Sequence, residues 1–258
     1  MIRAAVKIAY LGEKFSGSQA QPGCRTVGGE VLSALETIMK MPEEDIDLKF
    51  ASRTDKGVNS LGNVAVFNST IDDPDILLKA LNAVSKDIFF RSVAFVSKEF
   101  NPRFADIRRY RYIIRSEGMD IDTMRSCADL FKGEHDLVRF CRPNGKPTTV
   151  TLDSVELHKE GDLIILDVSA RYFLWNMIRR IAAAVMSVGR GDSSLSDVKD
   201  TIDGKDMTFG LARPDALTLL DVWYKDVEFI TPSADVLDRK IEEEIFGGRL
   251  RDMFLSSL

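Results

Sequence analysis

The sequence predicts an α+β fold made of two similar halves, in each of which helices pack against an antiparallel sheet. In residues 1–103 the predicted elements run strand, helix, strand, strand, helix, strand, and residues 104–258 repeat this order loosely. A chain of 258 residues has the length of two small domains. Hydrophobic residues make up 45% of it, which is ordinary for a folded protein and sufficient for two cores. We therefore expect one domain over 1–103 and another over 104–258.

The first half begins with a predicted strand over residues 2–10, a segment rich in strand formers. Thr26 is a suitable N-cap for a helix with apolar residues at spacings of three and four, namely Val27, Val31, Leu35, Ile38 and Met39. Asp73 and Pro74 open a second helix, for which we expect an inner face of Ile76, Leu77, Ala80, Leu81 and Val84. Strands are predicted over 47–53, 62–67 and 88–96. This order matches the split βαβ, or ferredoxin-like, pattern.

The second half opens with a strand over residues 107–115, in which two kinds of side chain alternate. The longest helical pattern follows later, with apolar residues at Leu174, Met177, Ile178, Ile181, Val185 and Val188. The remaining expected elements are helices near 121–132 and 195–202, strands over 149–157, 162–169 and 217–227, and a C-terminal helix. The two halves resemble each other in element order and not in residues.

Composition excludes several classes of protein and of site. No stretch has the roughly 18–20 apolar residues of a membrane span, and Lys7 interrupts the segment that a signal peptide would need. The three cysteines form no CxxC pair, which favours a reduced, cytoplasmic protein. With only two histidines, we expect no metal site and no histidine-based triad. Chemistry should depend on carboxylates, arginines or tyrosines.

Positive charge is concentrated in two segments of an otherwise acidic chain. The net charge is −5, but residues 98–115 carry six Lys or Arg against two acids. Residues 171–190 carry four arginines and no acid. Arginine offers a planar fork for phosphate and stacks on bases, so these segments suggest a nucleic-acid surface. The alternative is that they are solvated faces, balanced by acids elsewhere in the fold.

Asp55 is the strongest candidate for a reactive group. It lies in the turn Arg53-Thr54-Asp55-Lys56-Gly57, directly after a predicted strand. Such a segment is usually only a turn. Here two cations flank the carboxylate, however, and these would favour its ionised form and hold phosphates beside it. An ionised Asp at a strand end is a competent nucleophile or base.

Two further features point to the same chemistry. Tyr110 and Tyr112 share one face of the predicted strand over 107–115, where they form either a core face or a platform on which a base stacks. Arg179 lies off the apolar stripe of its helix. It is therefore either solvated or turned into a cleft, where it would pair with a buried acid.

Several motifs then match one family in the right order. The segment 52–62, SRTDKGVNSLG, closely resembles the G-R-T-D-x-G-V-H-A-x-G motif of the TruA family of tRNA pseudouridine synthases. The resemblance extends over some 200 residues, through Tyr10 to Pro22, Phe100 to Phe104, Arg109 to Tyr112, Phe173 to Gly191, and Ala212 to Leu217. Four residues depart from the family pattern, which usually has an aromatic residue at Ser18, a histidine at Asn59, often a histidine at Asn101, and a glycine at Ala216. They are typical of a divergent, archaeal member.

The resemblance implies a reaction and a set of residue roles. Asp55 would be the nucleophile that isomerises uridine to pseudouridine on the 3′ side of the tRNA anticodon stem-loop (positions 38–40 of the tRNA). Tyr112 would stack on the flipped uracil, Arg53 would fill the space it leaves, and Arg179 would pair with Asp55. The resemblance also assigns Gln19, Gln21 and Leu217 to substrate binding. It implies no cofactor, a homodimer in which one tRNA contacts both subunits, and a cleft between two domains whose sheets meet.

Two other functions compete with this interpretation. A non-catalytic RNA-binding module with two ferredoxin-like domains would bind RNA without forming a product. Another Asp-dependent enzyme, such as a phosphotransferase, would need metal-holding acids near Asp55 and a G-x-x-x-x-G-K phosphate loop. The sequence contains neither of these two features.

Overall fold

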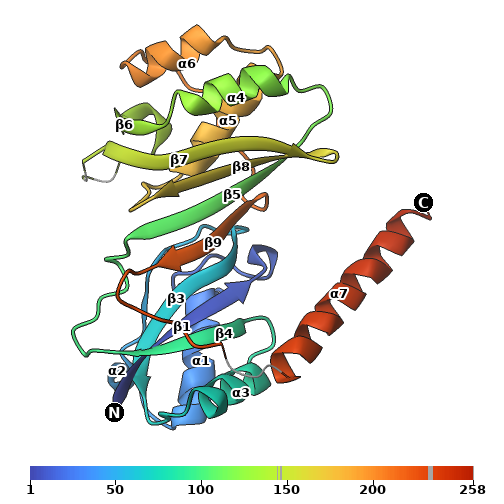
Figure 1. Ribbon diagram of the computed structural model, residues 1–258. Coiled ribbons are helices and arrows are strands. Elements are labelled where there is room, and N and C mark those ends of the chain that lie inside the picture. Colours follow the sequence, from blue (N-terminus) through green and yellow to red (C-terminus); the bar gives the residue numbers. More distant parts are fainter. Residues whose placement is uncertain (144, 146, 232–234, 258) are drawn as a thin grey trace.

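The computed structural model describes residues 1–143, 145, 147–231 and 235–257, and a single mixed sheet runs through these residues. The strand order is β4-β1-β3-β9-β5-β8-β7-β6, and β2 pairs with β3 off this path. The described neighbours run antiparallel except β3 and β9, which meet in parallel. The expected α+β class is confirmed. Helices cover the sheet in both halves of the molecule (Figure 1).

The first half follows the predicted element order. Its elements are β1 (Ile2–Tyr10), η1 (Gly12–Lys14), α1 (Val27–Met39), α2 (Glu43–Ile46), β2 (Lys49–Phe50), β3 (Asn59–Ser69), α3 (Pro74–Val84) and β4 (Phe89–Val96). The predicted caps are confirmed, because the Thr26 side chain accepts from Gly29 N and the Asp73 side chain accepts from Ile76 N. The strand expected over 47–53 shrinks to two residues, and the rest of that segment forms the loop that carries Asp55.

The predicted inner face of α3 was partly wrong. Ile76 and Val84 are exposed, whereas Leu78 and Asn82 are buried beside the expected Leu77 and Leu81. The buried stripe is rotated because it includes a polar residue that a hydrophobic pattern ignores. The Asn82 side chain bonds the backbone N–H and carbonyl of Phe90, and so ties α3 to β4.

The second half is built from β5 (Ile107–Arg115), α4 (Ile121–Asp129), β6 (Gly133–Asp136), η2 (Val138–Phe140), β7 (Thr149–Glu160), β8 (Leu163–Ala170), α5 (Met177–Gly189), α6 (Leu195–Ile202), β9 (Leu217–Trp223) and α7 (Asp235–Leu255). The predicted helix at Leu174 starts three residues later, and the predicted strand over 217–227 ends at Trp223. The short strand β6 was not predicted. It is a four-residue edge strand whose charged residues carry no hydrophobic alternation.

Two hydrophobic cores lie along the sheet. One contains only first-half residues, from α1, α3 and the faces of β1, β3 and β4 that they cover. The other is mainly second-half, but it also includes Ala5, Val64 and Val66 from β1 and β3. The halves are therefore joined by shared packing as well as by β9, which lies between β3 and β5.

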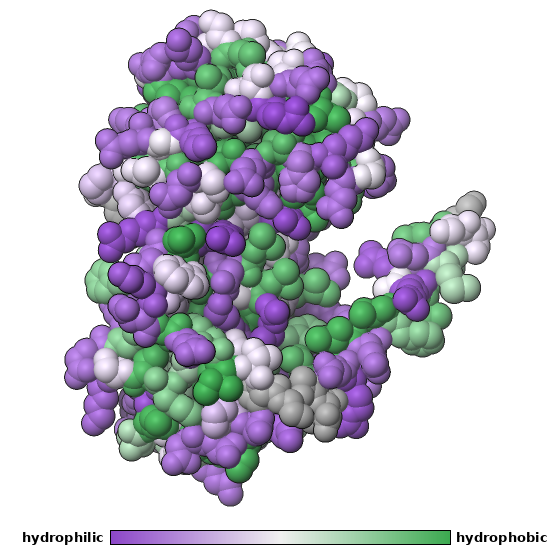
Figure 2. Space-filling model, viewed as in Figure 1, coloured by the Kyte–Doolittle hydropathy of each residue, from purple (hydrophilic) through white to green (hydrophobic). Residues whose placement is uncertain are grey.

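Helix α7 stands apart from the rest of the chain. It leaves the body near α3 and β4 and extends away from it (Figure 1). Lys240 anchors its first half by donating to the carbonyls of Ser85 and Ile88. Farther along, Phe246, Leu250 and Met253 are exposed, and Figure 2 shows hydrophobic residues along this helix. In the described residues, no helix has the length and apolar character that crossing a bilayer requires.

Candidate active site around Asp55

Asp55 lies in the loop between β2 and β3, and this loop has a defined shape. Its turn is closed by Val58 N donating to the carbonyl of Asp55, at 3.1 Å. Gly57 has a φ of +85°, a conformation that residues with a Cβ rarely adopt, and a Cβ there would approach Pro214 Cγ to 3.0 Å. The Asp55 side chain is 38% exposed, so it lies at a surface that a substrate can reach.

Ser18 clamps this loop from the first-half side. Its backbone N–H donates to the Thr54 carbonyl at 3.0 Å, and its hydroxyl oxygen accepts from Thr54 N at 2.8 Å. Gly17 approaches the same carbonyl so closely that a Cβ would lie 3.2 Å from it. Tyr10 adds a bond between its hydroxyl and Thr54 Oγ1, at 2.8 Å, and its burial raises the pKa of Tyr10. The serine that departs from the family pattern thus fixes the residue preceding Asp55.

Asn59, the second departure, ties three segments together. Its Oδ1 accepts from Gly12 N and its Nδ2 donates to the Asp215 carbonyl, both at 2.8 Å. The amide therefore links the end of the Asp55 loop to the segment after β1 and to the segment before β9. A buried or half-buried side chain that satisfies two backbone groups has a structural role.

Arg108, on β5, supports the Asp55 loop. The charge pattern of the sequence placed it among the cations of a nucleic-acid surface, and the structure places it in the interior instead. It is buried, and it donates to Ser52 Oγ at 3.0 Å, to the Ala51 carbonyl at 3.1 Å and to the Arg103 carbonyl at 2.9 Å. Burial lowers the pKa of its guanidinium. Arg108 therefore braces the strand that leads into Asp55, and it is not one of the surface cations that the charge pattern suggested.

The two carboxylate oxygens of Asp55 face donors from the second half. Arg179 Nη1 lies 3.5 Å from Oδ2, which is the pairing that the family resemblance implies. Trp175 Nε1 donates to Oδ1 at 3.2 Å. Arg179 is itself fixed, since its Nε donates to the Ala212 carbonyl at 2.7 Å and its side chain is only 13% exposed. The arginine off the apolar stripe of α5 is turned into the site and is not solvated.

Sequence reasoning missed Trp175. No local pattern marks it, because Trp175 precedes α5 and its acceptor lies 120 residues earlier in the chain. The indole is 44% exposed, and the guanidinium of Arg142 lies 4.2 Å from its ring centre. Asn176, which follows it, has a φ of +63° and directs the chain into α5.

Both tyrosines of β5 are buried, in agreement with the core alternative. Tyr110 packs edge-on against Phe173, and Tyr112 donates its hydroxyl to the Arg213 carbonyl at 3.0 Å. Burial raises the pKa of each tyrosine to about 12. Arg179 opposes this rise at Tyr112, whose hydroxyl remains protonated at neutral pH. Leu217 is buried opposite Tyr112 in the pairing of β5 with β9.

The other predicted binding residues lie on exposed loops and do not contact Asp55. Gln21 donates from Nε2 to the Ser16 carbonyl at 3.2 Å. The exposed side chains of Gln19 and Arg53 make no hydrogen bond or ion pair within the described residues. Arg53 stands two residues before Asp55 in the same loop.

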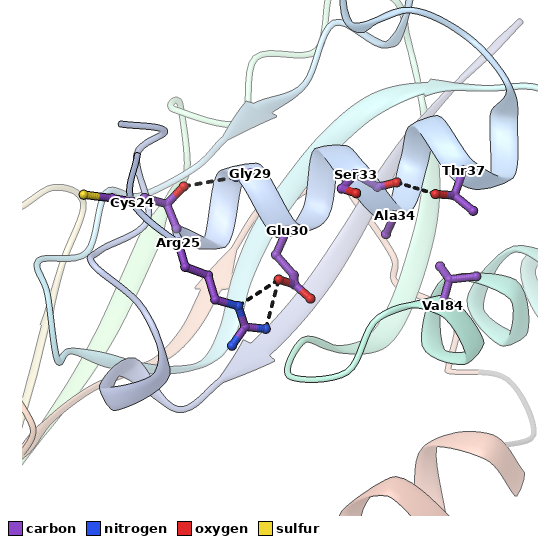
Figure 3. A pocket seen from close by; sticks show the side chains of 9 residues that line it. Cys24, Arg25, Gly29, Glu30, Ser33, Ala34, Thr37 and Val84 are labelled. Atoms are coloured by element: carbon purple, nitrogen blue, oxygen red, sulfur yellow. Dashed lines mark hydrogen bonds and ion pairs between the residues drawn. The ribbon is translucent and has the colours of Figure 1, made fainter. Parts of the chain in front are cut away.

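A cavity of about 230 Å³ lies elsewhere, at the start of α1 (Figure 3). Its lining includes Cys24, Arg25 and Glu30 and does not include Asp55. Arg25 is paired with Glu30 at 2.9 Å and with Asp87 at 2.7 Å, so its charge is already compensated. Among the described residues, no group of three or more His, Cys, Asp or Glu side chains is placed to hold a metal ion.

Comparisons with known proteins agree in pointing to one family. A family model described as tRNA pseudouridine synthase matches residues 127–225. The protein named tRNA pseudouridine synthase A from Pyrococcus abyssi is 37% identical over 95% of this chain and 92% of its own length. Proteins of the same name from Archaeoglobus fulgidus and Methanosarcina mazei are 36% and 38% identical, over 89% and 74% of this chain and 86% and 72% of their own.

Proposed function

We propose, from the premise that this chain belongs to the tRNA pseudouridine synthase A family, that Asp55 is the nucleophile of the reaction. The chain is an isomerase that converts uridine in tRNA to pseudouridine. The contact of Asp55 with Arg179 is the observation that carries our proposal, because it joins the motif loop of one half to the long helix of the other. Ser18 and Asn59, which depart from the family pattern, do not belong to this pair, and Asp55 and Arg179 remain in contact.

The reaction needs one carboxylate and a means of holding a loose base. Asp55 forms a transient bond with the target nucleoside, and the bond between N1 of the uracil and C1′ of the ribose breaks. The uracil rotates within the site and C5 bonds to C1′, while the bond to Asp55 breaks and restores the carboxylate. The proton of C5 passes to water, and N1 takes up a proton in its place. Because no electrons or groups move to a second substrate, the residues described here suffice without a cofactor. Fixing Asp55 before the substrate arrives lowers the entropic cost of this step.

The other predicted residues fit roles around the displaced base. Arg53 is free to enter the stack in place of the flipped uridine and to hold its phosphate. Gln19 and Gln21 lie on the exposed loop that Ser18 connects to Thr54, where they can contact the RNA. Tyr112 and Leu217 lie beneath the 213–215 segment. We propose that this segment shifts when tRNA binds, and that the Tyr112 ring then stacks on the uracil.

We further propose two ferredoxin-like domains, over 1–103 and 104–258. Strand order supports this division, because the first half runs β4-β1-β3-β2 and the second half β9-β5-β8-β7. With the short edge strand β6, which extends the second half beyond β7, left out of the count, both halves follow the order 4-1-3-2 of a split βαβ unit. The sheets meet where β3 pairs with β9, close to Asp55.

The substrate and its surroundings complete the proposal. We assign the modified uridines to the 3′ side of the anticodon stem-loop, and the assembly to a homodimer in which one tRNA contacts both subunits. The described cysteines are all free thiols, which supports a reduced cytoplasmic setting.

Replacing the nucleophile gives the direct test. Asp55→Asn should abolish tritium release from tRNA labelled at C5 of uridine, because an amide cannot form the bond to the nucleoside. Binding of tRNA should remain within a few fold of wild type, since the change preserves size. Asp122→Asn is the matched control, as that carboxylate is 92% exposed and pairs only with Arg125 on α4. Full activity of Asp55→Asn would refute the assignment, and a wild-type protein that binds tRNA without product would favour the non-catalytic RNA-binding module.

A further inference from the structure

Each oxygen of the Asp55 carboxylate is held by a different donor. Arg179 faces Oδ2 at 3.5 Å, while the indole N–H of Trp175 lies 3.2 Å from Oδ1. The final torsion of an aspartate side chain is broad, so a single donor leaves the carboxylate free to turn. Two donors on opposite oxygens fix its plane.

Packing does not account for the position of Trp175. The residue is 44% exposed, so burial in a core does not fix where the indole lies. It is also not loose. Arg142 stacks over its ring at 4.2 Å, and Arg142 N donates to the Trp175 carbonyl at 2.8 Å. The left-handed Asn176 completes this arrangement by setting where the residue before it lies.

We propose that Trp175 is a positioning residue for Asp55 and that Arg142 holds Trp175 in place. This inference rests on the proposed function, since it concerns how the nucleophile is aimed. The indole is a donor without charge. It therefore orients the carboxylate without adding a second cation, which would compete with Arg53 for the phosphates of the substrate.

Kinetics on the whole protein test this role. Trp175→Phe keeps a ring for Arg142 but removes the N–H, and we expect kcat to fall about 10- to 100-fold, as for other misaligned groups, with KM within about twofold. Trp223→Phe is the control, because Trp223 is exposed to 45%, lies at the end of β9 and makes no side-chain hydrogen bond within the described residues. Arg142→Gln should lower kcat less than Trp175→Phe. Equal kcat for Trp175→Phe and Trp223→Phe would overturn the proposal.

Fluorescence supplies a readout that does not depend on turnover. The chain has two tryptophans, so Trp175 is the sole emitter in a Trp223→Phe protein. Adding Asp55→Ala to this protein should shift the emission in the absence of RNA, because the acceptor of the indole N–H is removed. An unchanged spectrum would show that the contact does not exist in solution. If the wild-type protein forms no pseudouridine, the proposed function is refuted. The emission measurement still shows, independently of activity, whether the indole N–H contacts Asp55.

Discussion

The first-half side of the site holds the Asp55 loop through neutral hydrogen bonds to backbone, whereas the second-half side presents a guanidinium and an indole N–H to the carboxylate. Ser18 and Asn59 serve the first side, and each bonds backbone groups of other segments. Arg179 and Trp175 serve the second. The difference suggests a division of labour, in which one half makes the loop rigid and the other half sets the direction and charge of the carboxylate. Changes to Arg179 and Trp175 should therefore affect rate, and changes to Ser18 and Asn59 should affect stability.

Among the substitutions considered below, Arg179→Ala should change the measured properties most, through its effect on kcat. Removing the guanidinium leaves Oδ2 without its partner, and we expect kcat to fall roughly 100- to 1,000-fold, in line with the loss of a positioned charged group. The melting temperature should fall little, since its partner Asp55 is 38% exposed and water can solvate the carboxylate when the guanidinium is removed. Single-turnover pseudouridine formation and thermal unfolding measure the two quantities on the same protein. A large loss of stability with an unchanged rate would reverse the division of labour.

The buried tyrosines of the second-half side predict a loss of stability in alkali. A tyrosine has an ordinary pKa of about 10, and burial raises the pKa of Tyr110 and of Tyr112 to about 12. Because the folded state disfavours the ionised form, their contribution is complete below about pH 10 and is lost as pH rises toward 12. Linkage gives up to about 3 kcal/mol for each.

Denaturant unfolding at pH 8, 10 and 11 measures this loss. Tyr110→Phe should flatten the decline in unfolding free energy between pH 10 and 11. Tyr172→Phe is the control, because Tyr172 is exposed. Identical alkaline slopes for wild type and Tyr110→Phe would contradict the buried position of this ring.

Arg53, in the Asp55 loop, and Arg108, which supports that loop, should differ in whether their loss affects binding or stability. Arg108 is buried among carbonyls, whereas Arg53 is exposed and free of partners in the described residues. Arg53→Gln should therefore weaken tRNA binding and lower the slope of log affinity against log salt by about one. Arg108→Gln should lower the unfolding free energy instead. A salt slope unaffected by Arg53→Gln would mean that this guanidinium does not meet a phosphate.

Sequence reasoning succeeded where local chemistry decides the outcome. Thr26 and Asp73 cap helices because their side chains reach backbone N–H groups three residues ahead, a relation that short spacing reveals. It also singled out Asp55, because two cations flank it in the sequence, and Arg179, because it lies off the apolar stripe of its helix. It could not assign Arg108 to the interior, because carbonyls from 51, 103 and 171 converge on it only in three dimensions. Sequence reasoning missed Trp175 for the same reason, because the acceptor of its indole N–H lies 120 residues away in the chain.

Asn59→His, the change toward the family residue, should have the smallest effect. Asn59 uses one acceptor, for Gly12 N, and one donor, for the Asp215 carbonyl. A neutral imidazole offers the same pair, so stability at pH 8 should stay within about 1 kcal/mol of wild type. A protonated imidazole has two donors and no acceptor, so the bond from Gly12 should be lost near pH 6. Asn59→Leu, which lacks both groups, should cost about 2 kcal/mol at either pH. Comparing the unfolding free energies of the three proteins at pH 8 and pH 6 measures these differences. Equal stability of Asn59→Leu and wild type would show that the amide does not join the segments around the site.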